Sequence, residues 1–579
     1  MNKPLPLAGA AALGVAALLA ACANAPGGAP NAVATPARLS PATGATLQRC
    51  EALAAQFQHP ATRIESAVPV AAGELKLAGQ PVAAHCLVKG RMNERKGRDG
   101  RDYAIGFEMR LPQAWNGRFY HQGNGGLDGV VRPAEGALGG GPLTGALVQG
   151  FAVISSDAGH TGAQTPYFGL EPQARLDYGY QAVATLTPMA KALIASAYGK
   201  GPDRSYIGGC SNGGRHALVA ASRLSDQYDG YLIGAPGYRL PNAALAQLWG
   251  AQRWLPLATP GATVKHPLNP NASIPDLASA LTAAERETVA RAVLQRCDAL
   301  DGLTDGLVQA TQACQATFDP ARDVPTCSGA RDGRCLTPAQ KSALAQVHAG
   351  GRAANGQPIY SAFPWDAGIA GSNWATWKFV NAVALDPLSV GTVFTAPPVG
   401  LVDPAKADID ALLAAVAATD ATHRESGLSL MGPPGHEKPD NLLPLRARGA
   451  KVVLYHGVSD AIFSAEDTRQ WLERVNASQQ GRAADFARYF PVPGMNHCSG
   501  GPATDQFDLL GPLVQWVEHG VPPQAVKAQA RGAGNPGGVN TELPAAWSAQ
   551  RSRPLCAYPA VARYKGQGNP EDASSFSCQ

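Results

Sequence analysis

The sequence contains no dense run of lysine or arginine, and a net charge of +4 is small for 579 residues. It therefore lacks the basic patch with which nucleic-acid-binding proteins contact phosphates, and we expect no nucleic-acid partner. No two cysteines have C-x-x-C spacing, which argues against a zinc site. The glycine-rich loop 123–126 does not follow the G-x-G-x-x-G pattern, so nothing indicates a dinucleotide cofactor.

Long apolar runs are absent after Ala21, so no later segment is predicted to span a bilayer. Before that point, Lys3 precedes an alanine-rich apolar run, the pattern of a secretory signal at residues 1–22. Its end, LAAC, is similar to the lipobox of bacterial lipoproteins, in which Cys22 would be lipidated and become the new N-terminus. Cleavage at one of two A-x-A-like sites within residues 21–25 is the alternative. We expect an exported protein, either an outer-membrane lipoprotein or a periplasmic or secreted protein, that meets the membrane only through this anchor.

Ten cysteines remain when Cys22 is set aside. An even number in an exported chain is typical of a disulfide framework. Residues 23–45 are rich in alanine, proline, glycine and threonine, and we interpret them as a tether between the signal and the folded part.

Strand and helix patterns alternate in two parts of the chain, which indicates a mostly parallel α/β sheet. Between residues 238 and 440 the pattern loosens into loops with occasional helices, one of which opens with the capping box Thr282–Glu285. We therefore predict an α/β-hydrolase fold whose core, 46–237 and 441–579, is interrupted by a lid domain at 238–440. The predicted strands are 85–88, 103–111, 117–120, 151–155, 205–208, 230–234, 451–455 and 488–492, and the predicted helices are 176–198, 216–224, 282–295 and 405–418.

Residues 209–213 read GCSNG and fit G-x-S-x-G, the turn that presents a serine nucleophile in α/β hydrolases. A serine hydroxyl reacts only when an imidazole takes its proton, and the imidazole needs a carboxylate to hold it. In this fold the chain order is serine, aspartate, histidine, each after a strand. Asp460 and His497 follow the strands predicted at 451–455 and 488–492, so we expect Ser211, Asp460 and His497 to form a catalytic triad.

Cysteines adjoin two members of this candidate triad, because Cys210 precedes the serine and Cys498 follows the histidine. If Ser211 and His497 share a hydrogen bond, the two cysteines come near the Cα separation of about 4.4–6.8 Å that a disulfide needs. Cys210 as a thiol nucleophile is the alternative, but the turn would present Ser211 and an exported thiol would oxidise.

The motifs GGCSNGG at 208–214 and PGMNHCSGGP at 493–502 resemble the tannase and feruloyl esterase family, and the resemblance extends over the chain after the tether. It implies the same triad, with the backbone amides of Gly126 and Asn212 as the oxyanion hole. It also implies five disulfides: Cys50–Cys86, Cys210–Cys498, Cys297–Cys314, Cys327–Cys335 and Cys556–Cys578.

A loop in the predicted lid, 297–307, clusters three aspartates with two glycines. Hard oxygen ligands on a tight loop suit Ca²⁺, although the spacing is not that of an EF-hand. From the residues alone, a solvated acidic turn is an equally good interpretation. The resemblance to the family implies a structural Ca²⁺ held by the carboxylates of Asp298, Asp301 and Asp305 and the carbonyls of Leu303 and Leu307.

The resemblance also implies a small aromatic ester as substrate: a gallate, a hydroxycinnamate or the monoester of terephthalate. Trp377 matches a tryptophan that packs on the substrate ring in members that hydrolyse the terephthalate monoester, and Phe394 matches a mobile lid phenylalanine. Those members bind the free carboxylate with a lid arginine. The segment 379–394 contains no arginine. Val390 falls near the position of that arginine, and Lys378 is the nearby residue that would substitute for its charge.

Two further positions depart from the same members, because Gly125 replaces a serine and Asn212 replaces a glutamate. We expect a monomeric serine ester hydrolase that cleaves the terephthalate monoester, with feruloyl or gallate esters as the alternative substrates. A non-catalytic surface-binding lipoprotein is the remaining alternative, and the intact set of Ser211, Asp460 and His497 argues against it.

Overall fold

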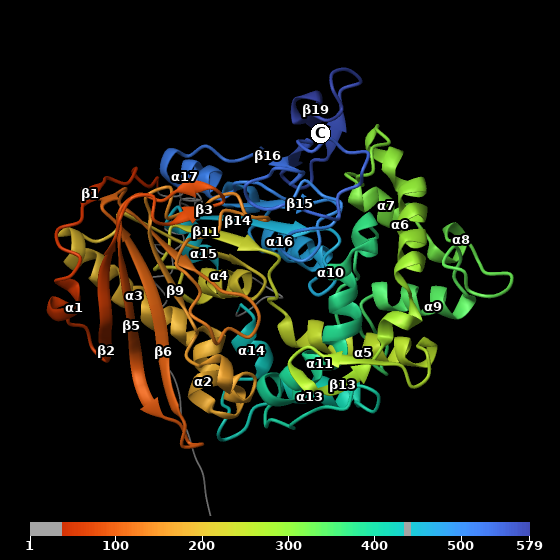
Figure 1. Ribbon diagram of the computed structural model, residues 1–579, viewed down its shortest axis with the longest axis horizontal. Coiled ribbons are helices and arrows are strands. Elements are labelled where there is room, and N and C mark those ends of the chain that lie inside the picture. The colour runs from red at the N-terminus through yellow and green to blue at the C-terminus, as the bar shows by residue number, and fades with distance from the viewer. Residues whose placement is uncertain (1–37, 434–441) are drawn as a thin grey trace, which may run out of the picture. The chain divides into compact units, whose positions relative to one another are not determined.

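The computed structural model describes residues 38–433 and 442–579 (Figure 1). The predicted signal, Cys22 and most of the predicted tether lie outside these ranges. Its last residues do not: Thr43 is hydrogen-bonded through its N–H and its hydroxyl to Asp203, and β1 (Ala45–Thr46) pairs with β7 (Ala114–Trp115). Within the described ranges, no helix is long and apolar enough to cross a membrane.

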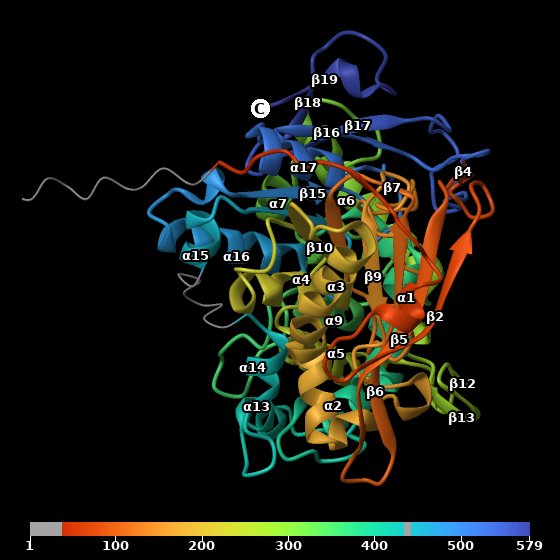
Figure 2. The ribbon, with the colours of Figure 1, turned by 90° about the vertical axis from the view of Figure 1, so that its left-hand side faces the viewer.

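A nine-stranded sheet forms the centre of the α/β-hydrolase fold, in the order β15-β14-β11-β10-β8-β9-β6-β5-β2. The six strands from β15 to β9 run parallel, and the three at the other edge pair antiparallel. Figure 2 shows the long antiparallel strands β5 and β6 at that edge, in orange. The strands are β2 (Thr62–Val70), β5 (His85–Lys96), β6 (Asp102–Pro112), β8 (Arg118–Gln122), β9 (Ala152–Ser156), β10 (Arg204–Cys210), β11 (Gly230–Gly234), β14 (Lys451–Gly457) and β15 (Ala487–Val492).

Helices cover both faces of this sheet. Apolar residues of α3 (Ala182–Tyr198), α4 (Asn212–Arg223) and α16 (Ala465–Ser478) join one buried cluster with alternate residues of the strands. Residues of α17 (Leu510–His519) join a second cluster with the opposite alternation. The central parallel strands β9, β11 and β14 are buried along their whole length, as expected for a sheet covered on both faces.

The segment predicted as the lid supplies most of a third buried cluster, centred on α5 (Leu240–Trp254). Figure 1 shows its helices, coloured from yellow-green to teal, gathered together. The exact bounds of a lid stay a prediction. Among the described residues of this segment, the other α-helices of four residues or more are α6 (Ala283–Cys297), α7 (Thr311–Thr317), α8 (Pro320–Asp323), α9 (Pro338–His348), α10 (Ser372–Ala375), α12 (Asp386–Ser389), α13 (Ile409–Ala417) and α14 (Gly427–Met431), and it also contains the wider-turn helices η8 (Thr376–Asn381) and η9 (Val390–Phe394).

The predicted capping box opens α6, because Thr282 Oγ1 accepts from the Glu285 N–H and the Glu285 carboxylate accepts from the Thr282 N–H at 2.8 Å. Small elements outside the main sheet were not predicted. They include α2 (Pro172–Leu176), α15 (Leu443–Ala447) and the hairpins β12–β13 (Thr263–His266, Asn269–Pro275), β16–β17 (Ala525–Gln529, Ser552–Cys556) and β18–β19 (Ala562–Tyr564, Phe576–Cys578).

All five predicted disulfides are present. The bond from Cys210, at the end of β10, to Cys498, in the loop after β15, joins residues 288 positions apart and encloses the whole lid segment. The Cys327–Cys335 bond closes a loop of only 8 residues. A cross-link stabilises mainly by restricting the unfolded chain, and it does so more when it closes a longer loop. The two bonds should therefore contribute different amounts to the free energy of unfolding.

We therefore predict that replacing both Cys210 and Cys498 with serine lowers the free energy of unfolding about twice as much as replacing both Cys327 and Cys335. The chain-entropy estimate is about 5.7 kcal/mol against about 2.5 kcal/mol. Urea unfolding of the two double variants beside the parent protein measures the difference. Equal losses would show that loop length does not set the contribution of the longer bond.

Candidate active site

Ser211 lies in a sharp turn between β10 and α4, with φ 65° and ψ −126°. A non-glycine residue rarely adopts a positive φ, so the surrounding turn must hold it there. The turn packs very closely against the loop after β8: a Cβ on Gly209 would lie 2.5 Å from the carbonyl oxygen of Gly123, and one on Gly213 would lie 2.3 Å from it. The glycines of G-x-S-x-G are therefore required by this close approach.

His497 lies between Ser211 and Asp460. Its Nε2 is 2.8 Å from Ser211 Oγ, and its Nδ1 is 2.6 Å from Asp460 Oδ2. His497 and Asp460 are both buried, since His497 is 8% exposed and Asp460 is 2% exposed. The second carboxylate oxygen, Oδ1, accepts from the backbone N–H groups of Ile462 and Phe463, each at 3.0 Å. The three residues expected from chain order are thus within hydrogen-bonding distance.

A second imidazole reaches the same carboxylate. His456 is fully buried, and its Nε2 lies 3.3 Å from Asp460 Oδ2 and 3.0 Å from the carbonyl oxygen of Phe463. Because a carbonyl only accepts, this nitrogen carries a proton. Burial alone would raise the pKa of Asp460, but the adjacent His497 and His456 lower it well below its usual range. The carboxylate therefore stays ionised at neutral pH.

The disulfide between Cys210 and Cys498 has a Cα separation of 5.9 Å and adjoins this hydrogen-bonded line at both ends. Its first sulfur precedes Ser211 in the chain and its second follows His497. Cys210 is therefore oxidised rather than available as a thiol nucleophile.

The two residues expected to form the oxyanion hole lie on separate segments that a buried carboxylate joins. Asn212 begins α4, and Gly126 lies in the loop after β8. Asp128, from the same loop, accepts from Asn212 Nδ2 at 2.6 Å and lies 2.9 Å from His216 Nε2 on α4. Tyr178 donates to the Gly126 carbonyl at 3.4 Å. Sequence patterns gave no signal for Asp128, because its role depends on this contact between loop and helix.

Aromatic rings cover the other side of His497. Trp377 lies edge-on to the imidazole, with ring centroids 5.1 Å apart, and Phe463 lies edge-on at 5.4 Å. Phe394 is buried at the end of η9. Gly125 is exposed, and a Cβ built on it would meet nothing within 4 Å.

Lys378 is buried, so its ammonium is not exposed to bind a carboxylate from solvent. The residue is 3% exposed, and its ammonium lies 3.5 Å from the centre of the Phe363 ring. Burial lowers the pKa of Lys378 to about 7, although Asp460 and Asp386 act in the opposite direction. Val390 is fully buried. Neither residue provides an exposed cation in this part of the lid.

The aspartates of the lid loop bind main-chain N–H groups. Asp298 accepts from Asp305 and Gly306, and Asp301 accepts from Leu303 at 3.2 Å and from Gln309 at 3.1 Å. The carboxylate of Asp305 pairs with Arg553. Within the described ranges, no group of three or more histidine, cysteine, aspartate or glutamate side chains is gathered as a metal site.

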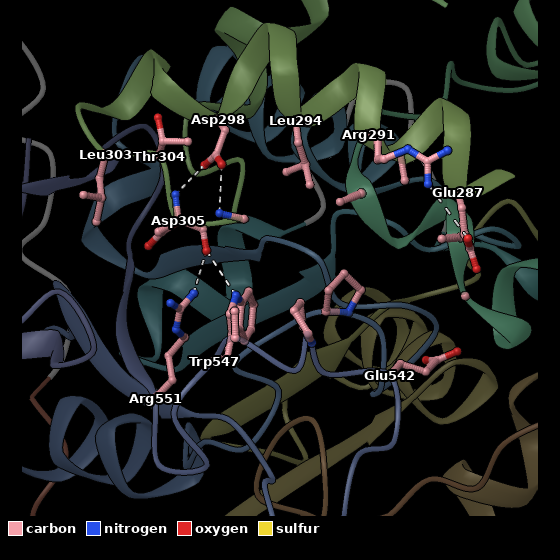
Figure 3. A pocket seen from close by; sticks show the side chains of 18 of the residues that line it. Glu287, Arg291, Leu294, Asp298, Leu303, Thr304, Asp305, Glu542, Trp547 and Arg551 are labelled. Atoms are coloured by element: carbon pink, nitrogen blue, oxygen red, sulfur yellow. Dashed lines mark hydrogen bonds and ion pairs between the residues drawn. The ribbon is translucent and has the colours of Figure 1, made fainter. Parts of the chain in front are cut away.

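This loop borders a cavity of about 810 Å³, whose lining does not include the candidate triad. Figure 3 shows Asp298 and Asp305 at one end of the cavity, above Trp547 and Arg551, which both donate to the Asp305 carbonyl. Glu542 lies toward the other end. The C-terminal segment therefore binds the backbone of the aspartate loop through Trp547 and Arg551.

The chain matches the family model described as tannase and feruloyl esterase over residues 86–579. It is 38% identical over 560 residues to mono(2-hydroxyethyl) terephthalate hydrolase from Piscinibacter sakaiensis, with 90% of this chain and 89% of that protein covered. A probable feruloyl esterase B-1 from Neosartorya fischeri is 27% identical over 517 residues, covering 81% of this chain and 82% of its own. The crystal structure of feruloyl esterase B from Aspergillus oryzae has the same fold, with a TM-score of 0.70 at 24% identity, covering 92% of this chain and 99% of that one.

Fold and relatives together define a carboxylic ester hydrolase, an enzyme rather than the binding lipoprotein kept as an alternative. The chain belongs to the tannase and feruloyl esterase family.

The buried Lys378 gives a prediction about stability and pH. In the unfolded chain a lysine has a pKa of about 10.4. Between about pH 7 and pH 10 the unfolded state therefore binds a proton that folded Lys378 does not, so this residue makes stability rise with pH. We predict that Lys378→Met removes part of this rise, on the order of a few kcal/mol, when urea unfolding is measured at the two ends of that window.

Lys406→Met is the matched control, because Lys406 lies in the same segment with its side chain 85% exposed. It should leave the pH dependence of the parent unchanged. A Lys378→Met variant with the same pH slope as the parent would show that Lys378 keeps an ordinary pKa in the folded protein.

Proposed function

We propose that this enzyme hydrolyses esters of small aromatic acids through an acyl-enzyme on Ser211. The observation that carries the proposal is the position of His497, within 2.8 Å of Ser211 Oγ on one side and 2.6 Å of Asp460 Oδ2 on the other. This is the arrangement in which an imidazole takes the proton of an attacking hydroxyl while a carboxylate stabilises the imidazolium that forms.

In the proposed reaction, Ser211 Oγ attacks the ester carbonyl carbon and its proton moves to His497 Nε2. The negative charge that develops on the carbonyl oxygen is stabilised by the backbone amides of Gly126 and Asn212. The ester C–O bond then breaks, and the imidazolium gives its proton to the leaving alcohol. A water molecule, deprotonated by the same imidazole, attacks the acyl-enzyme and releases the acid. Asp460, ionised throughout, keeps the imidazole oriented.

Aromatic surroundings support an aromatic acyl group. Trp377 and Phe463 present their rings to His497 within 5.4 Å, next to the place where an acyl group on Ser211 would stand. A flat ring can stack or meet their edges at such distances. We propose Trp377 as a substrate contact, and Phe394, at the end of η9, as a second one that is reached when the lid moves. The open space at Gly125 leaves room beside the ester.

Two classes of aromatic ester are candidates. The 38% identity to mono(2-hydroxyethyl) terephthalate hydrolase supports the terephthalate monoester, whose products are terephthalate and ethylene glycol. The burial of Lys378 on Phe363 favours the second class, feruloyl or gallate esters, because these acids bring no second carboxylate that needs a cation.

The five disulfides are typical of a protein that folds in an oxidising compartment, extracellular or periplasmic. We propose that the chain is exported by its N-terminal signal and anchored through lipidated Cys22, and that it acts as a monomer.

Measured on purified protein, the parent should hydrolyse mono(2-hydroxyethyl) terephthalate, methyl ferulate or methyl gallate. Ser211→Ala should lose at least about a thousandfold in kcat/KM, as expected when the nucleophile of a triad is removed. Equal rates on the terephthalate monoester and on its methyl ester would show that no free carboxylate is recognised and would select the second class. Near-parental turnover by Ser211→Ala would overturn the mechanism.

We also propose that the lid loop 298–307 holds a structural Ca²⁺. Ca²⁺ prefers carboxylate and carbonyl oxygens as ligands. This loop contains the carboxylates of Asp298, Asp301 and Asp305 and the carbonyls of Leu303 and Leu307. The ion would supply positive charge between carboxylates that accept from N–H groups and from Arg553, and it would take no part in ester hydrolysis.

Calcium at a hundredfold excess over its Kd should stabilise the folded protein by about 2.7 kcal/mol. The melting temperature should therefore fall when EGTA replaces Ca²⁺, and Asp301→Asn should abolish the difference. Asp403→Asn, which removes a half-exposed lid carboxylate outside this loop, is the matched control and should keep it. Identical melting curves of the parent in Ca²⁺ and in EGTA would remove calcium from the proposal.

A further inference from the structure

We propose that Asp366, on the lid segment, is a positioning residue for the triad: it fixes the position of the loop that carries Asp460 relative to the loop that carries His497. This inference rests on the function proposed above, in which those two residues work with Ser211. It assigns to the lid a role in building the catalytic machinery, besides contact with substrate.

Asp366 is 3% exposed and precedes the short helix η7 (Ala367–Ala370). Its carboxylate reaches both triad loops. Ser459, the residue before Asp460, donates its hydroxyl to Asp366 Oδ1 at 2.5 Å. The N–H of Gly494, in the loop that carries His497, donates to Asp366 Oδ2 at 3.3 Å. One buried lid side chain therefore bridges the acid loop and the base loop.

The two loops also touch each other directly, because the Ser459 N–H donates to the Met495 carbonyl at 3.0 Å. Asp366, the acid loop and the base loop are thus each hydrogen-bonded to the other two. Such a closed set of contacts fixes an angle as well as a distance, which is what an imidazole aimed at two partners needs.

Neighbouring lid residues repeat the connection. The backbone N–H of His497 itself donates to Asn373 Oδ1 at 3.3 Å. Glu542 accepts from the Ser372 N–H at 2.8 Å and from the Gly501 N–H at 2.7 Å, so it links the start of α10 to the end of the base loop. The lid therefore contacts the base loop through Asp366 and Asn373, and Glu542 of the core links the two at a third point.

The approach between lid and loops is too close for a larger residue. A Cβ on Gly368 would lie 2.4 Å from Ser459 Oγ and 2.8 Å from the Gly494 carbonyl oxygen. With its amide nitrogen toward the two carbonyls, Asn496 donates to Ser459 at 3.2 Å and to Gly368 at 3.1 Å. A lid that only covered the substrate would not need to pack against the loops in this way.

Asp366→Asn tests the inference, because the amide is nearly the same size but turns an N–H toward one of the donors that the carboxylate now accepts from. The assay uses 4-nitrophenyl acetate, whose two-carbon acyl group makes little use of a lid pocket for an aromatic acid. We expect kcat to fall at least about tenfold with KM within about twofold, since a small misplacement of a catalytic group alone costs this much. A loss of substrate contacts would raise KM instead.

Asp386→Asn is the matched control. Asp386 is a lid aspartate of similar burial, at 5% exposed, with one carboxylate oxygen that has no hydrogen-bond partner, and it makes no hydrogen bond to either triad loop in the described residues. Its variant should keep the parental kcat. A structural role of Asp366 alone would lower the melting temperature and leave kcat of the folded fraction unchanged.

Ser459→Ala removes the same bridge from the core side and decides the matter if Asp366→Asn does not fold. It should lower kcat, and the two changes together should cost less than the product of their separate effects. Parental kcat in folded Asp366→Asn, or in Ser459→Ala when the first variant does not fold, would overturn the inference. Ser211→Ala separates this outcome from a failure of the proposed function: if it remains active on the same ester, the mechanism fails, and if it is inactive while the bridge variants are fully active, only the positioning role fails.

Discussion

A single imidazole must meet a hydroxyl and a carboxylate at the same time, and much of the structure serves that condition. Ser211 and His497 are 286 positions apart in the chain, and neither loop alone fixes their distance of 2.8 Å. Parallel strands bring the loops of Ser211, Asp460 and His497 to the same end of the sheet. A disulfide joins the residue before Ser211 to the residue after His497, and the buried lid carboxylate of Asp366 links the Asp460 loop to the His497 loop. Each of these contacts is long-range in sequence.

Features that depend on local pattern were predictable. The strands β10, β14 and β15 and the turn at Ser211 follow from apolar runs and glycines, and the order of Ser211, Asp460 and His497 follows from the topology of the fold. Asp366 and Asp128 could not be found in this way. An aspartate in a loop is usually a turn or cap residue, and only tertiary contact shows which ones carry a bridge. The lid helix α5 was also missed, because it is apolar on nearly every side and gives no helical periodicity.

The lid combines two kinds of surface within a short stretch. Along residues 366–377 it presents polar groups and glycines to the triad loops and then, one turn later, the ring of Trp377 to His497. Directly after that ring, Lys378 turns into the apolar interior, where it lies over the Phe363 ring and burial lowers its pKa to about 7. The contacts that position His497 and the ring proposed to contact the acyl group therefore lie side by side, and a substitution in this stretch can act on both.

The cysteine connectivity has a consequence for biogenesis. Four of the five bonds join cysteines that are consecutive in the chain, but Cys210 must pair with Cys498 across two complete bonds. If cysteines were joined in the order in which they emerge from a translocation channel, Cys210 would meet Cys297 first. The native set is reached only when Cys210 stays reduced until the C-terminal strands arrive, or when a wrong pair is reshuffled by thiol exchange. Whenever Cys210 pairs too early, yield in a heterologous host therefore depends on disulfide isomerase capacity, independently of how stable the finished fold is.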